Sequence, residues 1–165
     1  MYKLGDELLN ATFTKKDISM SYRSINHYDQ MGLLLNIREK TSHWRKFTGL
    51  EIIWLNIIIT LRELGMPVKK IALLKKKLFD EGGKGSIDKA NFILKSFEEE
   101  IISSIQNKYE LFMLVFNDCS FTFLDSLSLN QWYNGIYKSE PHINIPLSNI
   151  INEVLINVKS KRKPK

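Results

Sequence analysis

One segment, Thr48 to Leu64, constrains the fold of this chain more than any other. Thr48 and Glu51 form a capping-box pattern, in which each side chain satisfies a backbone N–H of the first helical turn. Gly65 is a natural helix stop. The apolar residues lie nearly all round the predicted helix rather than along one stripe. Because such a helix must be covered on more than one side, the rest of the chain has to pack around it.

Further helices are predicted after this one. Pro67 suits the first turn of a second helix that runs to about Phe79. The segment 86–117 has apolar residues at three- and four-residue spacing, which predicts one long helix that needs a partner helix to cover its stripe. The residues expected in that dimerisation seam are Leu94, Phe97, Ile101, Ile105 and Phe112. The segment 146–158 predicts an amphipathic helix.

Two breaks divide the chain. The glycines at 82, 83 and 85 indicate a flexible connection, and Pro141 ends a preceding element. Between the long helix and the last one, residues 120–123 look extended and 126–137 suit a short helix. We therefore expect a mainly α protein with a first domain over 1–80, a dimerisation helix over 86–117, and a small helical C-terminal region over 118–165.

The charge is distributed unevenly along the 165 residues. Residues 1–80 carry 14 basic and 8 acidic side chains, whereas residues 81–165 carry 10 of each. A basic first half favours a polyanion-binding module, the alternative being a soluble protein with a patchy surface. The longest apolar run, within 52–59, is too short to span a membrane, and the N-terminus lacks a secretory pattern. We therefore expect a cytoplasmic protein.

Three segments carry a family resemblance. Residues 21–34 read SYRSINHYDQMGLL, residues 42–52 read SHWRKFTGLEI, and residues 61–71 read LRELGMPVKKI. In this order and spacing they resemble the MerR family of bacterial transcription regulators. The resemblance implies a winged helix-turn-helix DNA-binding domain with a small β-hairpin wing. The sequence departs from the family pattern at Asn26, at His27, and at the wing turn, which is Ser42-His43 here.

The start of this domain leaves two alternatives. Either residues 2–5 begin the first helix and an insertion follows, or residues 14–19 serve as that helix. Ser21 can then cap the helix that presents Tyr22, Arg23, Asn26 and His27. An arginine can pair with guanine and an asparagine with adenine in the major groove.

Cations on and after the predicted hairpin 35–47 suit phosphate contacts, which position a protein on DNA without reading sequence. Lys69 and Lys70 lie in the first turn of the helix begun at Pro67, where the helix dipole favours acids. The resemblance places this corner beside the DNA backbone; the alternative is two ordinary solvated lysines. The complete set of expected DNA-binding residues is Tyr22, Arg23, Asn26, His27, Tyr28, Arg38, Lys40, Trp44, Arg45, Lys46, Lys69 and Lys70.

The resemblance implies a homodimer on a pseudo-palindromic operator of double-stranded DNA, which distorts the promoter so that RNA polymerase can use it. An architectural or recombination-accessory protein, or a protein-interaction module, are the alternatives. We expect no enzyme activity and no cofactor, because the sequence has no phosphate loop, G-x-S-x-G or kinase signature. We expect no metal site, because His27, His43 and His142 lack ligand spacing. Cys119 suits a small buried side chain. The aromatic residues after 110 favour packing over the alternative, a pocket for an unidentified small-molecule effector.

Overall fold

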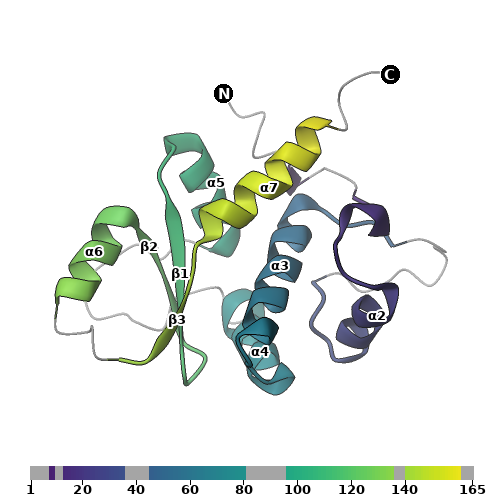
Figure 1. Cartoon of the computed structure of the whole chain (residues 1–165), viewed down its shortest axis with the longest axis horizontal. Helices are drawn as coiled ribbons and strands as arrows, with labels where there is room; N and C mark the ends of the chain where they lie inside the picture. Colours follow the sequence, from purple (N-terminus) through teal and green to yellow (C-terminus); the bar gives the residue numbers. More distant parts are fainter. Residues whose placement is uncertain (1–7, 10–12, 36–44, 81–95, 136–139, 161–165) are drawn as a thin grey trace. The chain divides into compact units, whose positions relative to one another are not determined.

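The computed structural model describes residues 8–9, 13–35, 45–80, 96–135 and 140–160, which Figure 1 draws as coloured ribbon. Over these residues the chain is mainly helical, as the sequence predicts, with one small three-stranded sheet. The chain divides into two compact units. The first comprises residues 1–68 and 151–165, and the second comprises residues 69–150.

The first unit is built around α3 (Gly49–Glu63). The predicted capping box is present: the Thr48 backbone N–H donates to Glu51 Oε2 (2.7 Å), and the Glu51 N–H donates to Thr48 Oγ1 (3.2 Å). The helix ends at Glu63, with Leu64 as its C-cap. Gly65 follows with a φ of 85°, a left-handed conformation that costs glycine little. Trp54 is fully buried, and its indole Nε1 donates to the carbonyl of Leu33 (2.8 Å). The prediction for this segment is confirmed.

A short 3-10 helix, η1 (Lys15–Asp17), and the helix α2 (Tyr22–Gln30) precede α3. An isolated β-bridge joins Phe13 to Phe47 through two backbone hydrogen bonds of 2.7 and 2.9 Å. The last helix, α7 (Leu147–Ser160), confirms the amphipathic prediction for 146–158. In its part of the first unit, α7 buries Ile151, Val154, Leu155 and Val158.

The second unit begins within α4 (Val68–Lys75), which continues as the π-helical turn η2 (Lys76–Asp80). The predicted helix from Pro67 to about Phe79 is therefore present. The next described helix is α5 (Phe97–Asn107), which starts with a capping box formed by Ser96 and Glu99 and is followed by the C-cap Lys108, whose φ is 56°.

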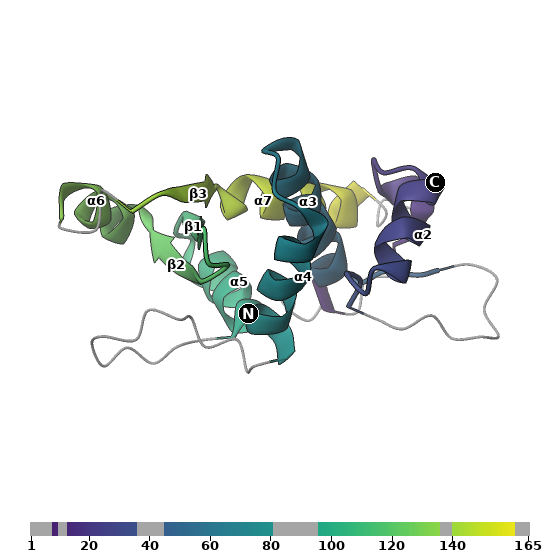
Figure 2. The ribbon, with the colours of Figure 1, turned by 90° about the horizontal axis from the view of Figure 1, so that it is seen from below.

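Three antiparallel strands follow: β1 (Leu111–Phe116), β2 (Phe121–Asp125) and β3 (His142–Ile145), in the order β2-β1-β3. The helix α6 (Ser126–Asn134) lies between β2 and β3 in the chain. Both views place α5 beside the sheet (Figures 1 and 2), and the Phe97 ring lies 6.0 Å from that of Phe123 on β2. The extended stretch near 120–123 and the start of the short helix at 126 are as predicted.

The prediction of one helix over 86–117 is wrong from Lys108 onward, and its residues 86–95 lie outside the described part of the chain. The run Leu111–Phe116 is apolar at every position, which suits a central strand covered on both faces as well as a buried helix. Phe112 therefore lies on a strand. Phe97 is buried and packs edge-on against Phe79 (ring centroids 5.3 Å apart), and Ile101 is also buried. The C-terminal region is correspondingly not purely helical.

Candidate nucleic-acid interface

The helix α2 presents a polar face. Its cap is Ser21, whose hydroxyl accepts a hydrogen bond from the Ser24 backbone N–H (3.0 Å). Ile25 is the single buried residue of α2, whereas the residues exposed on it include Tyr22, Arg23, Asn26 and His27. Tyr28 is half-buried, with its ring centroid 5.8 Å from that of His27. A helix anchored on one side and polar on the other can offer hydrogen-bonding side chains to a groove.

The turn before α2 is also ordered by local hydrogen bonds. Asp17 Oδ2 accepts from the Thr14 backbone N–H (2.6 Å) and from the Thr14 hydroxyl (3.0 Å). Of the two alternatives for the first helix, the one within 14–19 corresponds to the short 3-10 helix η1. The other, which begins at 2–5, lies outside the described residues.

Arg45 is tied to α2 by an ion pair. Its Nη1 lies 2.7 Å from Asp29 Oδ2, and the two side chains are only 11% and 33% exposed. The guanidinium carbon also lies 5.7 Å from the ring centroid of Phe47, within the range of a cation–π contact. Arg45 therefore connects α2 to the segment that enters α3. Sequence reasoning placed Arg45 on the DNA face but did not predict its carboxylate partner.

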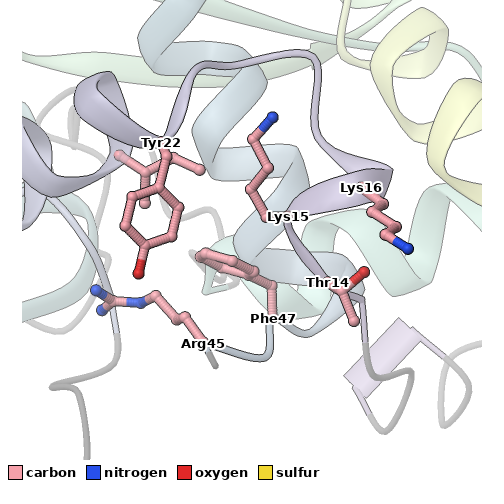
Figure 3. Close-up of a pocket in the computed structure, with 7 residues that line it drawn as sticks. Thr14, Lys15, Lys16, Tyr22, Arg45 and Phe47 are labelled. Atoms are coloured by element: carbon pink, nitrogen blue, oxygen red, sulfur yellow. The ribbon is translucent and has the colours of Figure 1, made fainter. Parts of the chain in front are cut away.

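A pocket of about 450 Å³ lies beside this ion pair. Figure 3 shows Phe47 at its centre, with the Tyr22 hydroxyl directed towards the Arg45 side chain. The described residues that line it are Thr14, Lys15, Lys16, Tyr22, Ile25, Arg45 and Phe47. Lys15 and Lys16 were not among the predicted site residues, although two adjacent lysines shortly before a predicted reading helix were a usable signal.

The helix α2, the Asp29–Arg45 ion pair and the pocket all lie in a segment that matches a known protein family. Residues 14–78 match the model of the MerR HTH family regulatory proteins. This segment is a MerR-family helix-turn-helix domain. The match begins just before η1 and runs into η2, so it includes α2 and α3. The match indicates that this segment belongs to a DNA-binding regulatory protein. No curated protein matches the chain.

The MerR segment continues into the second unit, where Lys69 and Lys70 lie on α4. Lys69 is exposed. Lys70 Nζ donates to the carbonyl (2.9 Å) and to Oδ1 (2.5 Å) of Asn117, in the turn between β1 and β2. One predicted phosphate ligand is thus engaged within the chain.

A second lysine of this unit, Lys77, reaches the same turn and donates to the carbonyl of Asp118 (3.0 Å). Hydrogen bonds from Ser120, with a smaller contribution from Lys77, lower the pKa of Asp118. Cys119 is buried in this turn, and burial raises the pKa of its thiol. The finding agrees with the interpretation of Cys119 as a small packed side chain.

The remaining predicted residues of the MerR domain divide into two groups. Lys46 is exposed next to Arg45. The other group lies outside the described residues and comprises Arg38, Lys40 and Trp44, together with most of the hairpin predicted over 35–47. Leu94 of the predicted seam also lies outside them. Within the described ranges, no group of acidic, histidine or cysteine side chains could hold a metal ion, and no helix is long and apolar enough to cross a membrane.

Proposed function

We propose that this chain is a sequence-specific transcriptional regulator that binds pseudo-palindromic promoter DNA as a homodimer and distorts it. The observation that carries the proposal is the division of α2 into two sides. Ile25 anchors the helix in the core, while Tyr22, Arg23 and Asn26 remain exposed. Within a MerR-family helix-turn-helix domain, this is the division that a recognition helix requires.

In this proposal the first turns of α2 read base edges. Arg23 can donate two hydrogen bonds to guanine, and Asn26 can both donate to and accept from adenine. Tyr22 and His27 flank them on the exposed side. The Asp29–Arg45 ion pair supports this reading by holding the C-terminal half of α2.

Phosphate contacts come from cations around that helix. Lys46 supports such a role because it is exposed beside the domain's core. Lys69 is exposed on α4, in a first turn where the helix dipole opposes a positive charge unless an anion is near. Such contacts strengthen binding to any sequence and make it sensitive to salt.

The homodimer follows from the symmetry of helix-turn-helix readers, whose two-fold axis matches a pseudo-palindromic site. Distortion of the promoter would let RNA polymerase use a spacer of unfavourable length. Of the predicted seam residues on α5, Ile105 keeps part of its side chain accessible, while Phe97 and Ile101 are buried within the chain. Of the predicted seam residues on α5, Ile105 is therefore the one that a partner chain can reach.

The test begins with selection of bound duplexes from a random double-stranded DNA library by the full-length protein. We expect a pseudo-palindromic consensus, and affinity for it should fall steeply as salt rises, because counterions are released from several phosphates. Selection without a consensus, with salt-sensitive binding retained, would favour an architectural protein. Absence of DNA binding would exclude both DNA-binding functions and leave a protein-interaction module as the remaining alternative.

Transcription from a promoter that contains the selected site then tests regulation. We expect the protein to change the transcript level. If it bound the promoter without changing the transcript level, the proposed role in regulation would be contradicted. Sedimentation tests the dimer: the wild type should sediment as a dimer, and Ile105→Asp should weaken it because a buried charge is unfavourable at an interface. Ile156→Asp, at a 64% exposed position on α7, is a matched control. A monomeric wild type would exclude the homodimer.

A further inference from the structure

The pocket beside α2 has the size and lining of a small-molecule site. Its volume of about 450 Å³ falls within the range of roughly 300–1,000 Å³ that is common for such sites. Its lining comes from η1, from the first turn of α2, and from residues 45–47. Figure 3 shows that these three segments surround the Phe47 ring.

We propose that this pocket binds an apolar organic anion, and that the bound anion competes with DNA for the N-terminal end of α2. The competition rests on the proposed DNA-binding function. Occupation of the pocket does not, since it depends only on the residues that line it. The two parts can therefore fail separately.

The floor of the pocket suits an apolar body. Ile25 and Phe47 are 3% and 2% exposed, so each is held by the core of the first unit. The two backbone hydrogen bonds between Phe13 and Phe47 fix the segment that carries the ring. Tyr22 adds an aromatic wall and keeps 42% of its surface exposed. A flat aromatic or aliphatic group can pack against these side chains without reorganising the fold.

The charge around the floor selects an anion. Lys15, Lys16 and Arg45 are cationic, and the described lining contains no carboxylate. Asp29 compensates Arg45 through their ion pair. Asp17, the acid nearest to the two lysines in sequence, has an oxygen engaged by the backbone and hydroxyl of Thr14. These hydrogen bonds leave the negative charge of Asp17 in place, but the two lysines outnumber it, so the rim keeps a net positive charge that attracts a carboxylate or sulfonate.

Competition follows from the shared position of Tyr22. Tyr22 lines the pocket and also lies on the face of α2 that we propose for base reading. A ligand there would neutralise the lysine rim and bring a negative charge next to the incoming phosphates. For simple competition the apparent Kd for DNA rises by one plus the ratio of ligand concentration to its own Kd, which is about tenfold when that ratio is nine.

The probe for the pocket is anilinonaphthalene sulfonate, a fluorescent aromatic anion, titrated into the full-length protein without DNA. We expect saturable fluorescence at one site. The double variant Lys15→Glu/Lys16→Glu should bind the dye roughly tenfold more weakly, because two attractive charges become repulsive. Lys46→Glu is the matched control, since Lys46 is an exposed cation next to Arg45 that does not line the pocket. Far-ultraviolet circular dichroism confirms that each variant folds.

The outcomes separate the parts of the proposal. No dye binding, or equal binding by the wild type and the double variant, would overturn the pocket. Phenylnaphthylamine, the uncharged analogue of the dye, should bind much more weakly, and equal affinity would overturn the selection of an anion. A mixture of protein, dye and selected DNA should show the calculated rise in apparent Kd, and an unchanged Kd would overturn the competition. Absence of DNA binding in the dye-free reaction would instead contradict the proposed function.

Discussion

The helices α2 and α3 belong to the same unit and begin in the same way, with a hydroxyl side chain that accepts from the third residue of the helix. They differ in what they bury. Of the 9 residues of α2, Ile25 alone is buried, whereas α3 (15 residues) buries most of its length. Burial of apolar side chains on α3 therefore contributes more to the free energy of folding than burial on α2. Most side chains of α2 remain exposed and can contact a partner. We therefore expect substitutions in α3 to affect mainly stability and substitutions on the exposed face of α2 to affect mainly DNA binding.

The largest expected effect is on α3. Trp54→Ala should lower the free energy of unfolding by about 3–5 kcal/mol, because a large cavity forms. It also leaves the carbonyl of Leu33 without its indole donor. Chemical denaturation measures the loss. Leu64→Ala, at a 59% exposed position just after α3, is the control and should change stability by about 0.5 kcal/mol or less. Similar losses for both variants would contradict the difference between core and surface.

The next effect is on α2. Arg23→Ala should reduce discrimination at one base pair of the selected site by about 1–3 kcal/mol, as expected for a bidentate contact to guanine. Its stability should stay within about 0.5 kcal/mol of the wild type, since Arg23 is exposed. Competition binding with single-base variants of the duplex measures the first quantity.

Lys46→Ala is the matched control for Arg23→Ala. Loss of a phosphate contact should weaken binding to all sequences by similar factors and lower the salt slope by about one. If Arg23→Ala weakened all sequences equally, Arg23 would be a phosphate contact and α2 would not read bases through it.

The two caps provide a direct comparison of the helices. Ser21→Ala and Thr48→Ala should each reduce stability by about 0.5–2 kcal/mol. We expect the larger loss for Thr48→Ala, because that cap is half-buried and reciprocates with Glu51, whereas Ser21 is exposed. Thermal or urea unfolding of both variants checks the order. A larger loss for Ser21→Ala would show that α2 contributes more to folding than its burial suggests.

The smallest expected effect concerns the ion pair that joins α2 to the segment before α3. In a double-mutant cycle with Asp29→Asn and Arg45→Ala, the coupling free energy should be about 0.2–1 kcal/mol, and it should decrease as salt rises. The two variants should also weaken DNA binding by similar factors if Arg45 acts by positioning α2. A much larger loss for Arg45→Ala would mean that this guanidinium contacts phosphate directly.

Local signals in the sequence were sufficient for α2, α3 and α7. Ser21, Thr48 and Gly65 define helix ends through hydrogen bonds or backbone conformations that involve only neighbouring residues. The apolar spacing in 146–158 identified the buried face of α7 for the same reason. The three MerR-like segments located the domain because their residues keep a characteristic order along the chain. Each of these features depends on residues that are close together in the sequence or keep a fixed order along it.

The sheet could not be obtained in this way. The run Leu111–Phe116 is apolar enough for a buried helix or a central strand, and its pairing decides between them. Met113 is opposite Phe123 on one side and Ile145 on the other, so β1 becomes a strand by pairing with β2 across a short turn and with β3 further along the chain. The three- and four-residue spacing that extended the predicted helix to residue 117 was a coincidence of an almost uniformly apolar run.

The same reasoning separates the predicted interface residues from the contacts that the structure shows. Exposure of Arg23 and Asn26 on α2 follows from helical spacing around Ile25, and sequence reasoning reached those residues. The pairing of Arg45 with Asp29, and the pocket that Lys15 shares with Phe47, join positions far apart in the chain. Sequence patterns specify which side chains a helix turns outward, because that depends on local geometry. Which of those side chains meet, and what space they enclose, depends on how the segments pack in the tertiary structure.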